Sequence, residues 1–219
     1  MTLPNELLEA PELALYEEQI KTRLEEERRL REKFREELTP GRKAELINGE
    51  VIVHSPATTR HTRSRMLLSR LLSTHVETRN LGMVLDEKAL VCLTRNDYEP
   101  DVLFYGPEKA VGIEPGQLLF PAPDFIAEVL SETTAHRDRG VKFRDYAAHG
   151  VAEYWLVDTG AEAVEQYELA RTGYALRLKS GSGNVRSLVV PGFEIPIRAV
   201  FDPEENLRVL RRMFQAPGA

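Results

Sequence analysis

The fold is decided by residues 123–146, which read PDFIAEVLSETTAHRDRGVKFRDY. The stretch begins as an apolar strand, and strands alternate their faces with a period of two. Glu128 therefore shares a face with Ile126 and Leu130. A carboxylate on an apolar face is costly unless a neighbouring group compensates its charge. The stretch predicts a buried strand that carries one acid in need of a partner.

A helix and a second strand follow this first strand. Residues 131–134 read SETT, which is suitable N-cap chemistry for a helix of about 136–149, and Gly150 is placed to end that helix. The segment AEYWLVD, 152–158, has the composition of another buried strand, with Tyr154 and Trp155 as core residues.

The preceding chain supplies the other elements of an α/β unit. An amphipathic helix is predicted at about 61–79, and strands at 82–93 and 99–106. Residues 107–122, rich in Gly and Pro, are expected to form a connecting loop. The order from 61 to 158 is helix, three strands, helix, strand, which predicts an α/β sandwich with a central mixed sheet flanked by helices. Shorter β segments are expected at 163–169, 173–179 and 185–190.

The N-terminal part carries one long charged helix and one hairpin. The helix is predicted over 12–38, ended by Pro and Gly in TPGR, 39–42. Its apolar residues fall on a spacing of three and four, but Glu27 and Arg31 interrupt the row, so both a solvated helix and a dimerising coiled coil stay open. The hairpin, 44–53, turns at Asn-Gly, which favours a type I′ turn. It places Glu45, Glu50 and two isoleucines on one face.

Composition narrows the class of protein. The chain has 219 residues, a formal charge of −6 and a single cysteine, Cys92, which excludes an internal disulfide and a cysteine-built zinc site. The net charge argues against a strongly basic nucleic-acid coat, although local basic patches remain. No apolar run approaches the roughly 18 residues of a membrane span. With no secretory signal visible either, we expect no membrane association and a cytoplasmic location.

Two acids lie in apolar strand sequences, Glu128 and Asp101 of YEPDVLFY. A divalent cation would compensate both, since Mg²⁺ prefers hard oxygen ligands and often takes only one or two carboxylates. The residues alone leave an alternative open, in which both acids simply pair with Arg137, Arg139 or Lys142.

Three segments of the chain stand in order: AELINGEVIVHSPATTRH, YEPDVLFY and PDFIAEVLSETTAHRDRGVKFRDYAAHGVAEYWLVD. Together they resemble the Uma2 family, whose fold is related to the PD-(D/E)XK restriction-endonuclease superfamily. The resemblance covers about residues 44–201 and leaves the N-terminal helix outside. It implies that Asp101 and Glu128 bind the metal with help from the backbone carbonyl of Val129.

This sequence departs from the superfamily motif at one position. Leu130 stands where the motif has its lysine, and Lys142 on the following helix is the expected substitute because its long stem can reach back. Glu50, or Glu45, is a candidate third acid.

Two further candidates lie within the motifs. His61 and Arg139 are candidate substrate contacts, and Asp138 could orient Lys142. A capping or packing histidine and a surface lysine are the alternatives for His61 and Lys142.

These features predict a Mg²⁺-dependent endonuclease acting on DNA, with Mn²⁺ as a possible substitute cation. The alternative is a module on the same fold that binds DNA or another protein and is catalytically weak or inactive. A third possibility is an enzyme that hydrolyses RNA or a nucleotide. We expect a restriction-endonuclease-like domain over 42–219 and a helical extension over 1–41. A homodimer assembled through that extension is also expected.

Overall fold

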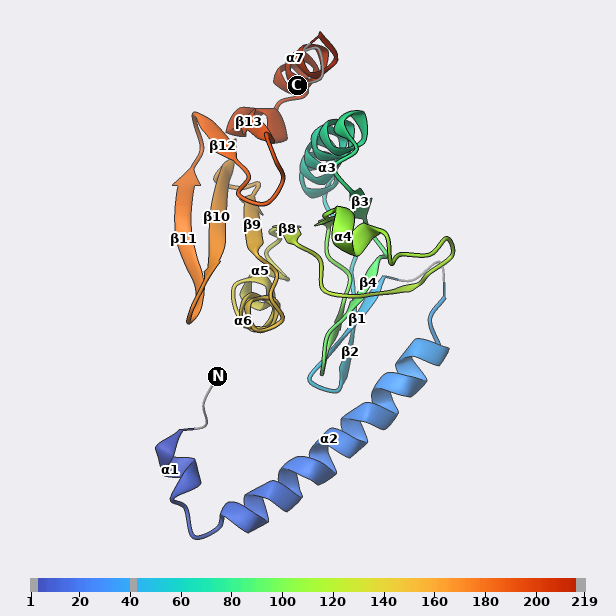
Figure 1. Ribbon diagram of the computed structural model, residues 1–219, viewed down its shortest axis with the longest axis vertical. Coiled ribbons are helices and arrows are strands. Elements are labelled where there is room, and N and C mark those ends of the chain that lie inside the picture. The colour runs from blue at the N-terminus through green and yellow to red at the C-terminus, as the bar shows by residue number, and fades with distance from the viewer. Residues whose placement is uncertain (1–3, 40–42, 216–219) are drawn as a thin grey trace. The chain divides into compact units, whose positions relative to one another are not determined.

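The computed structural model describes residues 4–39 and 43–215 (Figure 1). The chain divides into two compact units. The first unit runs to His54 and also contains Thr94–Tyr98, and the second unit contains Ser55–Leu93 and the chain from Glu99 onward. The predicted domain boundary after residue 41, and the Pro and Gly expected to end the long helix, lie outside the described residues.

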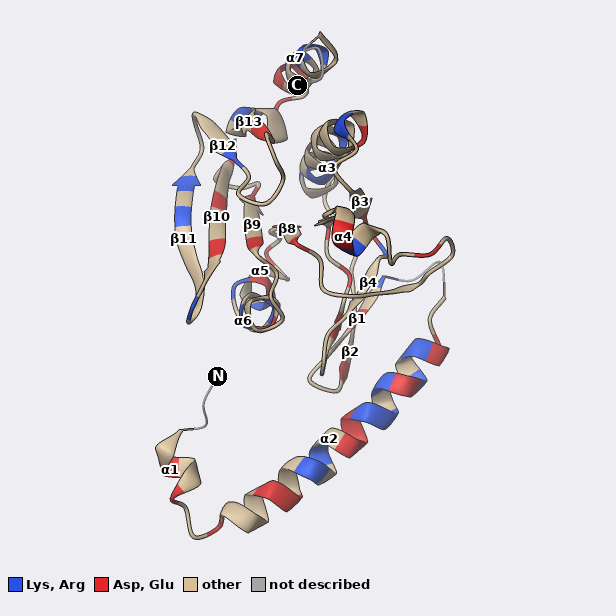
Figure 2. Ribbon diagram, in the orientation of Figure 1, with Lys and Arg blue, Asp and Glu red and all other residues tan. Residues whose placement is uncertain are grey.

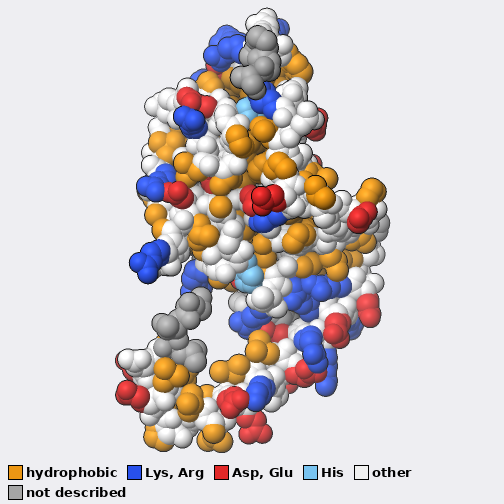
Figure 3. Space-filling view, in the orientation of Figure 1, with side chains coloured by type: hydrophobic (Ala, Val, Ile, Leu, Met, Phe, Trp, Pro, Cys, Tyr) orange, Lys and Arg blue, Asp and Glu red, His pale blue; other side chains and the backbone are white. Residues whose placement is uncertain are grey.

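The first unit contains α1 (Asn5–Leu8) and the long helix α2 (Leu13–Glu36). The prediction of one helix over 12–38 is confirmed. Acidic and basic residues alternate along the α2 ribbon (Figure 2). Hydrophobic side chains lie among them on the surface of the two helices (Figure 3).

The interruption of the apolar row of α2 has a local cause in this unit. Glu27 is 3% exposed and accepts a hydrogen bond from Arg95 Nε to its Oε2 at 2.6 Å. Arg31 donates from Nε to both carboxylate oxygens of Asp97, each at 3.0 Å. Burial opposes the ionised form of Asp97, but the hydrogen bonds from Arg31 and Arg35 outweigh it and lower its pKa. Charged residues therefore interrupt the apolar row because, in the C-terminal half of α2, they form ion pairs with Arg95 and Asp97 of the same unit.

The predicted hairpin is formed by β1 (Ala44–Ile47) and β2 (Glu50–Val53). Ile47 pairs with Glu50 and Glu45 with Ile52, as the sequence predicts. Asn48 and Gly49 have φ of 52° and 83°, as the type I′ turn requires. Only glycine fits at position 49 without strain, because a Cβ there would also lie 2.9 Å from Glu27 Cγ. Strand β5 (Asp97–Tyr98) pairs antiparallel with β1.

The second unit is built on a six-stranded mixed sheet of order β11-β10-β9-β8-β6-β3. Strands β8 and β9 pair in parallel, and the other neighbours pair antiparallel. The strands are β3 (Met83–Asp86), β6 (Val102–Tyr105), β8 (Phe125–Val129), β9 (Glu153–Asp158), β10 (Ala163–Ala170) and β11 (Gly173–Ser180). Two small strand pairs accompany them, β4 (Leu90–Cys92) with β7 (Leu119–Phe120), and β12 (Asn184–Arg186) with β13 (Glu194–Pro196).

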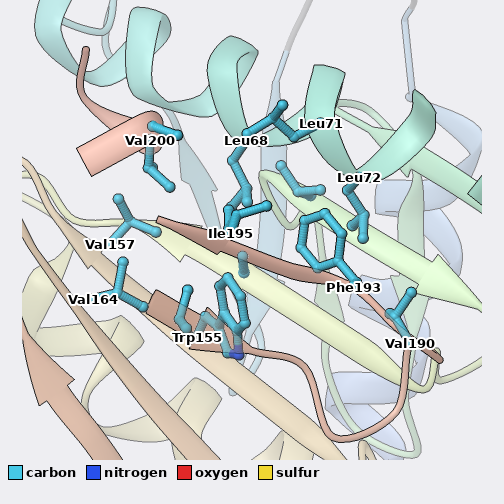
Figure 4. Close-up of a cluster of buried hydrophobic side chains, with 14 of the residues drawn as sticks. Leu68, Leu71, Leu72, Trp155, Val157, Val164, Val190, Phe193, Ile195 and Val200 are labelled. Atoms are coloured by element: carbon cyan, nitrogen blue, oxygen red, sulfur yellow. The ribbon is translucent and has the colours of Figure 1, made fainter. Parts of the chain in front are cut away.

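One face of this sheet forms the hydrophobic core (Figure 4). Helix α3 (Thr59–Arg79) lays Leu68, Leu71 and Leu72 over Trp155 and neighbouring strand residues. The segment from β12 through η1 (Ile197–Val200) to α7 (Pro203–Gln215) contributes to the same cluster. None of the helices in the described parts of the chain is both long and apolar enough to cross a membrane.

The opposite face is covered by α5 (Ala135–Asp138) and α6 (Val141–Ala148). Phe143 of α6 packs edge-on against Tyr154, Tyr167 and Tyr174 of the sheet, at ring-centroid distances of 6.1, 4.9 and 5.1 Å. Tyr154 and Trp155 are fully buried, so their prediction as core residues is confirmed. With α3, β3, β6, β8, α5–α6 and β9 in sequence, the predicted mixed α/β architecture flanked by helices is confirmed.

Several predicted boundaries were wrong. The single strand expected over 82–93 is two strands, β3 and β4, and the expected loop 107–122 contains α4 (Pro107–Ala110) and β7. The helix expected over 136–149 is broken at Gly140, where a Cβ would lie 2.6 Å from the His136 carbonyl oxygen. The segment expected over 185–190 is the shorter β12, and α7 was not predicted.

Candidate active site

Two buried acids lie side by side where β6 and β8 pair. The antiparallel register aligns Val102 with Ala127, and one further step aligns Asp101 with Glu128. Val102 and Ala127 belong to the hydrophobic core, so the two acids lie on the opposite face, the one that α5 and α6 cover. Asp101 and Glu128 are each only 3% exposed. The sheet therefore brings the two predicted metal ligands together.

The Asp101 carboxylate is held by a backbone N–H group and lies beside helix α3. Its Oδ2 accepts a hydrogen bond from the backbone N–H of Val129 at 2.9 Å. Its Oδ1 lies 3.5 Å from Nε2 of His61, in the first turns of α3. Thr58 caps that helix by accepting from the His61 backbone N–H at 3.3 Å. His61 is thus brought to the acid pair, and the capping interaction uses its main chain only.

Glu128 receives two donors from α6 on the same oxygen. Lys142 Nζ and Tyr146 OH each lie 3.0 Å from Glu128 Oε1. Lys142 Nζ also lies 3.3 Å from Asp138 Oδ1. Lys142 is 2% exposed, so it is no surface lysine. Lys142 therefore pairs with Glu128, a contact that the sequence left open as an alternative to metal binding, and Asp138 contacts the ammonium as suggested. The role of Lys142 at a metal-bound water stays a prediction. We call Asp101, Glu128, Asp138 and Lys142 the acid–lysine cluster.

The cluster gathers three carboxylates and one ammonium in a buried setting, where charge interactions are stronger than in water. Tyr154 OH donates to the Asp138 carbonyl oxygen at 3.1 Å. Burial raises the pKa of Tyr154 well above its ordinary value, and the negative charges of Glu128 and Asp138 add to the effect. The Tyr154 phenol therefore stays protonated and remains a donor.

The donor set suits a hard divalent cation. Asp101 and Glu128 supply carboxylate oxygens from adjacent strands, and Mg²⁺ commonly uses one or two carboxylates while water and phosphate complete its shell. Within residues 4–39 and 43–215, no group of three or more His, Cys, Asp or Glu side chains is placed to hold a metal ion, so of these side chains the protein would offer the cation only the two carboxylates. Val129 ends β8 beside both acids, and its role as a carbonyl ligand stays a prediction.

Arg139 lies against a different partner. Its guanidinium donates to both carboxylate oxygens of Glu165 on β10, at 2.6 and 2.9 Å. The hydrogen bond from Arg139 is the main cause that lowers the pKa of Glu165 to about 2, with Tyr167 and Lys179 also contributing. The role of Arg139 as a substrate contact stays a prediction.

Glu50 and Glu45 belong to the first unit. Glu50 is exposed on β2, whereas Glu45 is buried on β1 with its Oε2 3.1 Å from His54 Nε2. The catalytic role expected of Glu50 stays a prediction.

Tyr146 is the site residue that the sequence reasoning missed. Lys142 and Tyr146 lie four residues apart on α6, so they fall on one side of that helix, and Asp138 lies four residues before Lys142 at the end of α5. That spacing was a usable signal, but a tyrosine on an amphipathic helix reads first as core.

One protein-family model matches most of the chain. The family described as "Uma2: Putative restriction endonuclease" matches residues 24–198. The uncharacterized protein sll1609 of Synechocystis sp. (strain ATCC 27184 / PCC 6803 / Kazusa) is 32% identical over 128 residues, which span 58% of this chain and 72% of that protein.

A solved structure shows a similar fold. The crystal structure of a "putative nuclease belonging to DUF820" from Anabaena variabilis ATCC 29413 has a TM-score of 0.67 and 15% identity. The match covers 78% of this chain and 96% of that one. The predicted nuclease-like fold is thereby confirmed.

Proposed function

The chain belongs to the Uma2 family, and from that premise we propose that it is a metal-dependent endonuclease that hydrolyses DNA phosphodiester bonds. One observation carries the proposal. Two carboxylates from paired strands, Asp101 and Glu128, share one face of the sheet, and the Lys142 ammonium lies 3.0 Å from the second. Two acids and a lysine in this arrangement can bind a cation and stabilise charge on a phosphodiester. A purely structural ion pair would need only one acid and one basic residue.

The cation is proposed to be Mg²⁺, with Mn²⁺ as a substitute, held by Asp101, Glu128 and the Val129 carbonyl. When bound there, such an ion would supply charge neutralisation on the phosphodiester and lower the pKa of water. The hydrogen bond from the Val129 N–H to Asp101 Oδ2 orients that carboxylate in advance.

Lys142 is proposed to place a positive charge next to the reacting phosphate. Fixed charges aimed at developing negative charge stabilise a transition state without reorganisation. Asp138 holds the ammonium 3.3 Å away from its Oδ1, so the lysine is anchored on both sides. His61, beside Asp101, is proposed to contact the substrate from the α3 side.

Nicking of supercoiled plasmid tests the proposal. Wild-type protein is expected to nick with Mg²⁺ or Mn²⁺ and to stop with EDTA, and Asp101→Asn is expected to lose about 100-fold in rate. Asp158→Asn is the matched control, because Asp158 Oδ1 also accepts backbone N–H bonds, from Gly160 and Ala161, each at 2.9 Å. No cleavage by folded wild-type protein would favour the binding-module alternative.

A homodimer through α2 is proposed as the assembly. Leu13, Tyr16, Ile20 and Leu24 are spaced by three and four residues and are 37–51% exposed, so they form an uncovered apolar row. We expect sedimentation velocity to find a dimer that Ile20→Glu dissociates. Leu118→Glu, at a leucine that is 69% exposed outside α2, should leave it intact. A monomeric wild type would contradict this assembly.

A further inference from the structure

Tyr146 is a buried polar residue that the proposed function does not use. It is fully buried on α6, and its hydroxyl lies 3.0 Å from Glu128 Oε1. Its ring packs edge-on against Tyr154, with centroids 5.4 Å apart. Packing alone would be served equally by phenylalanine, so the hydroxyl needs another explanation.

The hydroxyl and the lysine act on the same atom. Tyr146 OH and Lys142 Nζ both donate to Glu128 Oε1, four residues apart on one helix. Two donors that converge on one carboxylate oxygen fix the rotation of the carboxylate plane, and so determine the direction in which Oε2 points. A ligand whose orientation is fixed in advance binds a cation more tightly than one that must be ordered on binding.

We infer that Tyr146 is a positioning residue, which holds Glu128 so that its Oε2 is presented to the divalent cation. The inference rests on the proposed function, because it assigns Glu128 to the cation. In this role Tyr146 acts through the Glu128 carboxylate and not on the cation itself. Lys142 alone does not set this orientation, because its ammonium is shared between Glu128 and Asp138.

The chain offers a matched control in Tyr154. This tyrosine is also fully buried in the same aromatic group, and it too donates one hydrogen bond, but to the main-chain oxygen of Asp138 at 3.1 Å. Tyr146→Phe and Tyr154→Phe each delete one buried hydroxyl from neighbouring positions. Only the first deletion removes a bond to a proposed cation ligand.

Isothermal titration of the full-length proteins with MnCl₂ tests the inference. Tyr146→Phe is expected to bind Mn²⁺ about 10-fold more weakly than wild type, the range found when groups that orient metal ligands are removed. Tyr154→Phe should bind within twofold of wild type. Raising the Mn²⁺ concentration should restore plasmid nicking by Tyr146→Phe, which a general folding defect would not allow.

Failure of the positioning role can be distinguished from failure of the proposed function. Equal Mn²⁺ affinity in wild type and Tyr146→Phe would overturn the positioning role and leave the proposed function standing. Equal weakening in both tyrosine variants would overturn it as well, since the effect would then follow from any lost buried hydroxyl. A wild type that binds no Mn²⁺ would overturn the proposed function and the positioning role together.

Discussion

Glu128 and Glu153 are two buried acids on adjacent parallel strands, and they have opposite surroundings. Glu128 points to the face covered by α5 and α6, where it accepts hydrogen bonds from Lys142 and Tyr146. The carboxylates of Asp101 and Asp138 lie nearby. Glu153 alternates with Tyr154 and so shares the core face with Trp155. Both are at most 3% exposed. Burial of a carboxylate therefore does not by itself mark a functional site.

The partners of Glu153 identify it as a structural residue. Its Oε1 accepts from Trp155 Nε1 and Gln166 Nε2, both at 2.6 Å. Its Oε2 accepts from the Ser187 hydroxyl at 2.7 Å and from the backbone N–H groups of Leu188 and Val189 at 2.8 and 3.1 Å. Five neutral donors from several elements satisfy both oxygens of the Glu153 carboxylate. This is expected of a residue that holds the loop at 187–189 against the core.

The largest expected effect concerns Lys142, which has a counterpart in Lys179. Lys142→Ala should slow plasmid nicking about 100-fold, because the charge beside the reacting phosphate is lost. Lys179 pairs with Glu165 at 2.9 Å but is 61% exposed, and Lys179→Ala should change the rate less than twofold. Initial rates on one plasmid preparation, with circular dichroism to confirm folding, provide the measurement. Similar rates for the two variants would remove Lys142 from the mechanism.

A second difference is expected in stability. Glu153→Gln turns an amide N–H₂ toward groups that are themselves donors, and should lower the free energy of unfolding by about 3 kcal/mol. Glu128→Gln keeps an oxygen for Lys142 and Tyr146 and removes one of three neighbouring negative charges, so its loss should be below about 1 kcal/mol. Urea unfolding of the two variants measures both values. An equal loss would mean that Glu128 is as structural as Glu153.

The smallest expected effect is a pH dependence at Glu165. Its folded-state pKa of about 2 lies below its ordinary 4.5, chiefly through the bond from Arg139. The pair's stabilisation is thus fully present above pH 4.5 and lost as pH falls toward 2. Arg139→Met should flatten this part of the curve of unfolding free energy against pH, measured by urea titration. An unchanged slope would show that Arg139 contributes nothing through Glu165 and free it for a substrate role.

Periodicity predicted the elements that form the site. The alternation around Glu128 and the acid of YEPDVLFY located two strands whose pairing the structure confirms. Lys142 was expected as the substitute for the lysine that the superfamily motif has at position 130, and the structure places its ammonium at Glu128. Local patterns were sufficient here because the acids, the strand end and the helix all lie within 46 residues, 101–146.

The remainder depended on contacts that local patterns do not encode. The helix breaks at Gly140, where the backbone leaves no room for a side chain, because a Cβ would lie 2.6 Å from the His136 carbonyl oxygen. Helix α7 exists because Val209 and its neighbours complete a core built by distant strands. Arg139 faces Glu165, 26 residues away, and the Tyr146 hydroxyl donates to Glu128, 18 residues away.

The central claim is that Glu128 is buried for chemistry and Glu153 for structure. The most direct test is the Mg²⁺-dependent nicking rate of Glu128→Gln and Glu153→Gln, each per folded molecule at a temperature where both remain native. We predict a loss of about 100-fold in Glu128→Gln and a rate within a few-fold of wild type in Glu153→Gln. Cleavage by Glu128→Gln at the wild-type rate would contradict the claim.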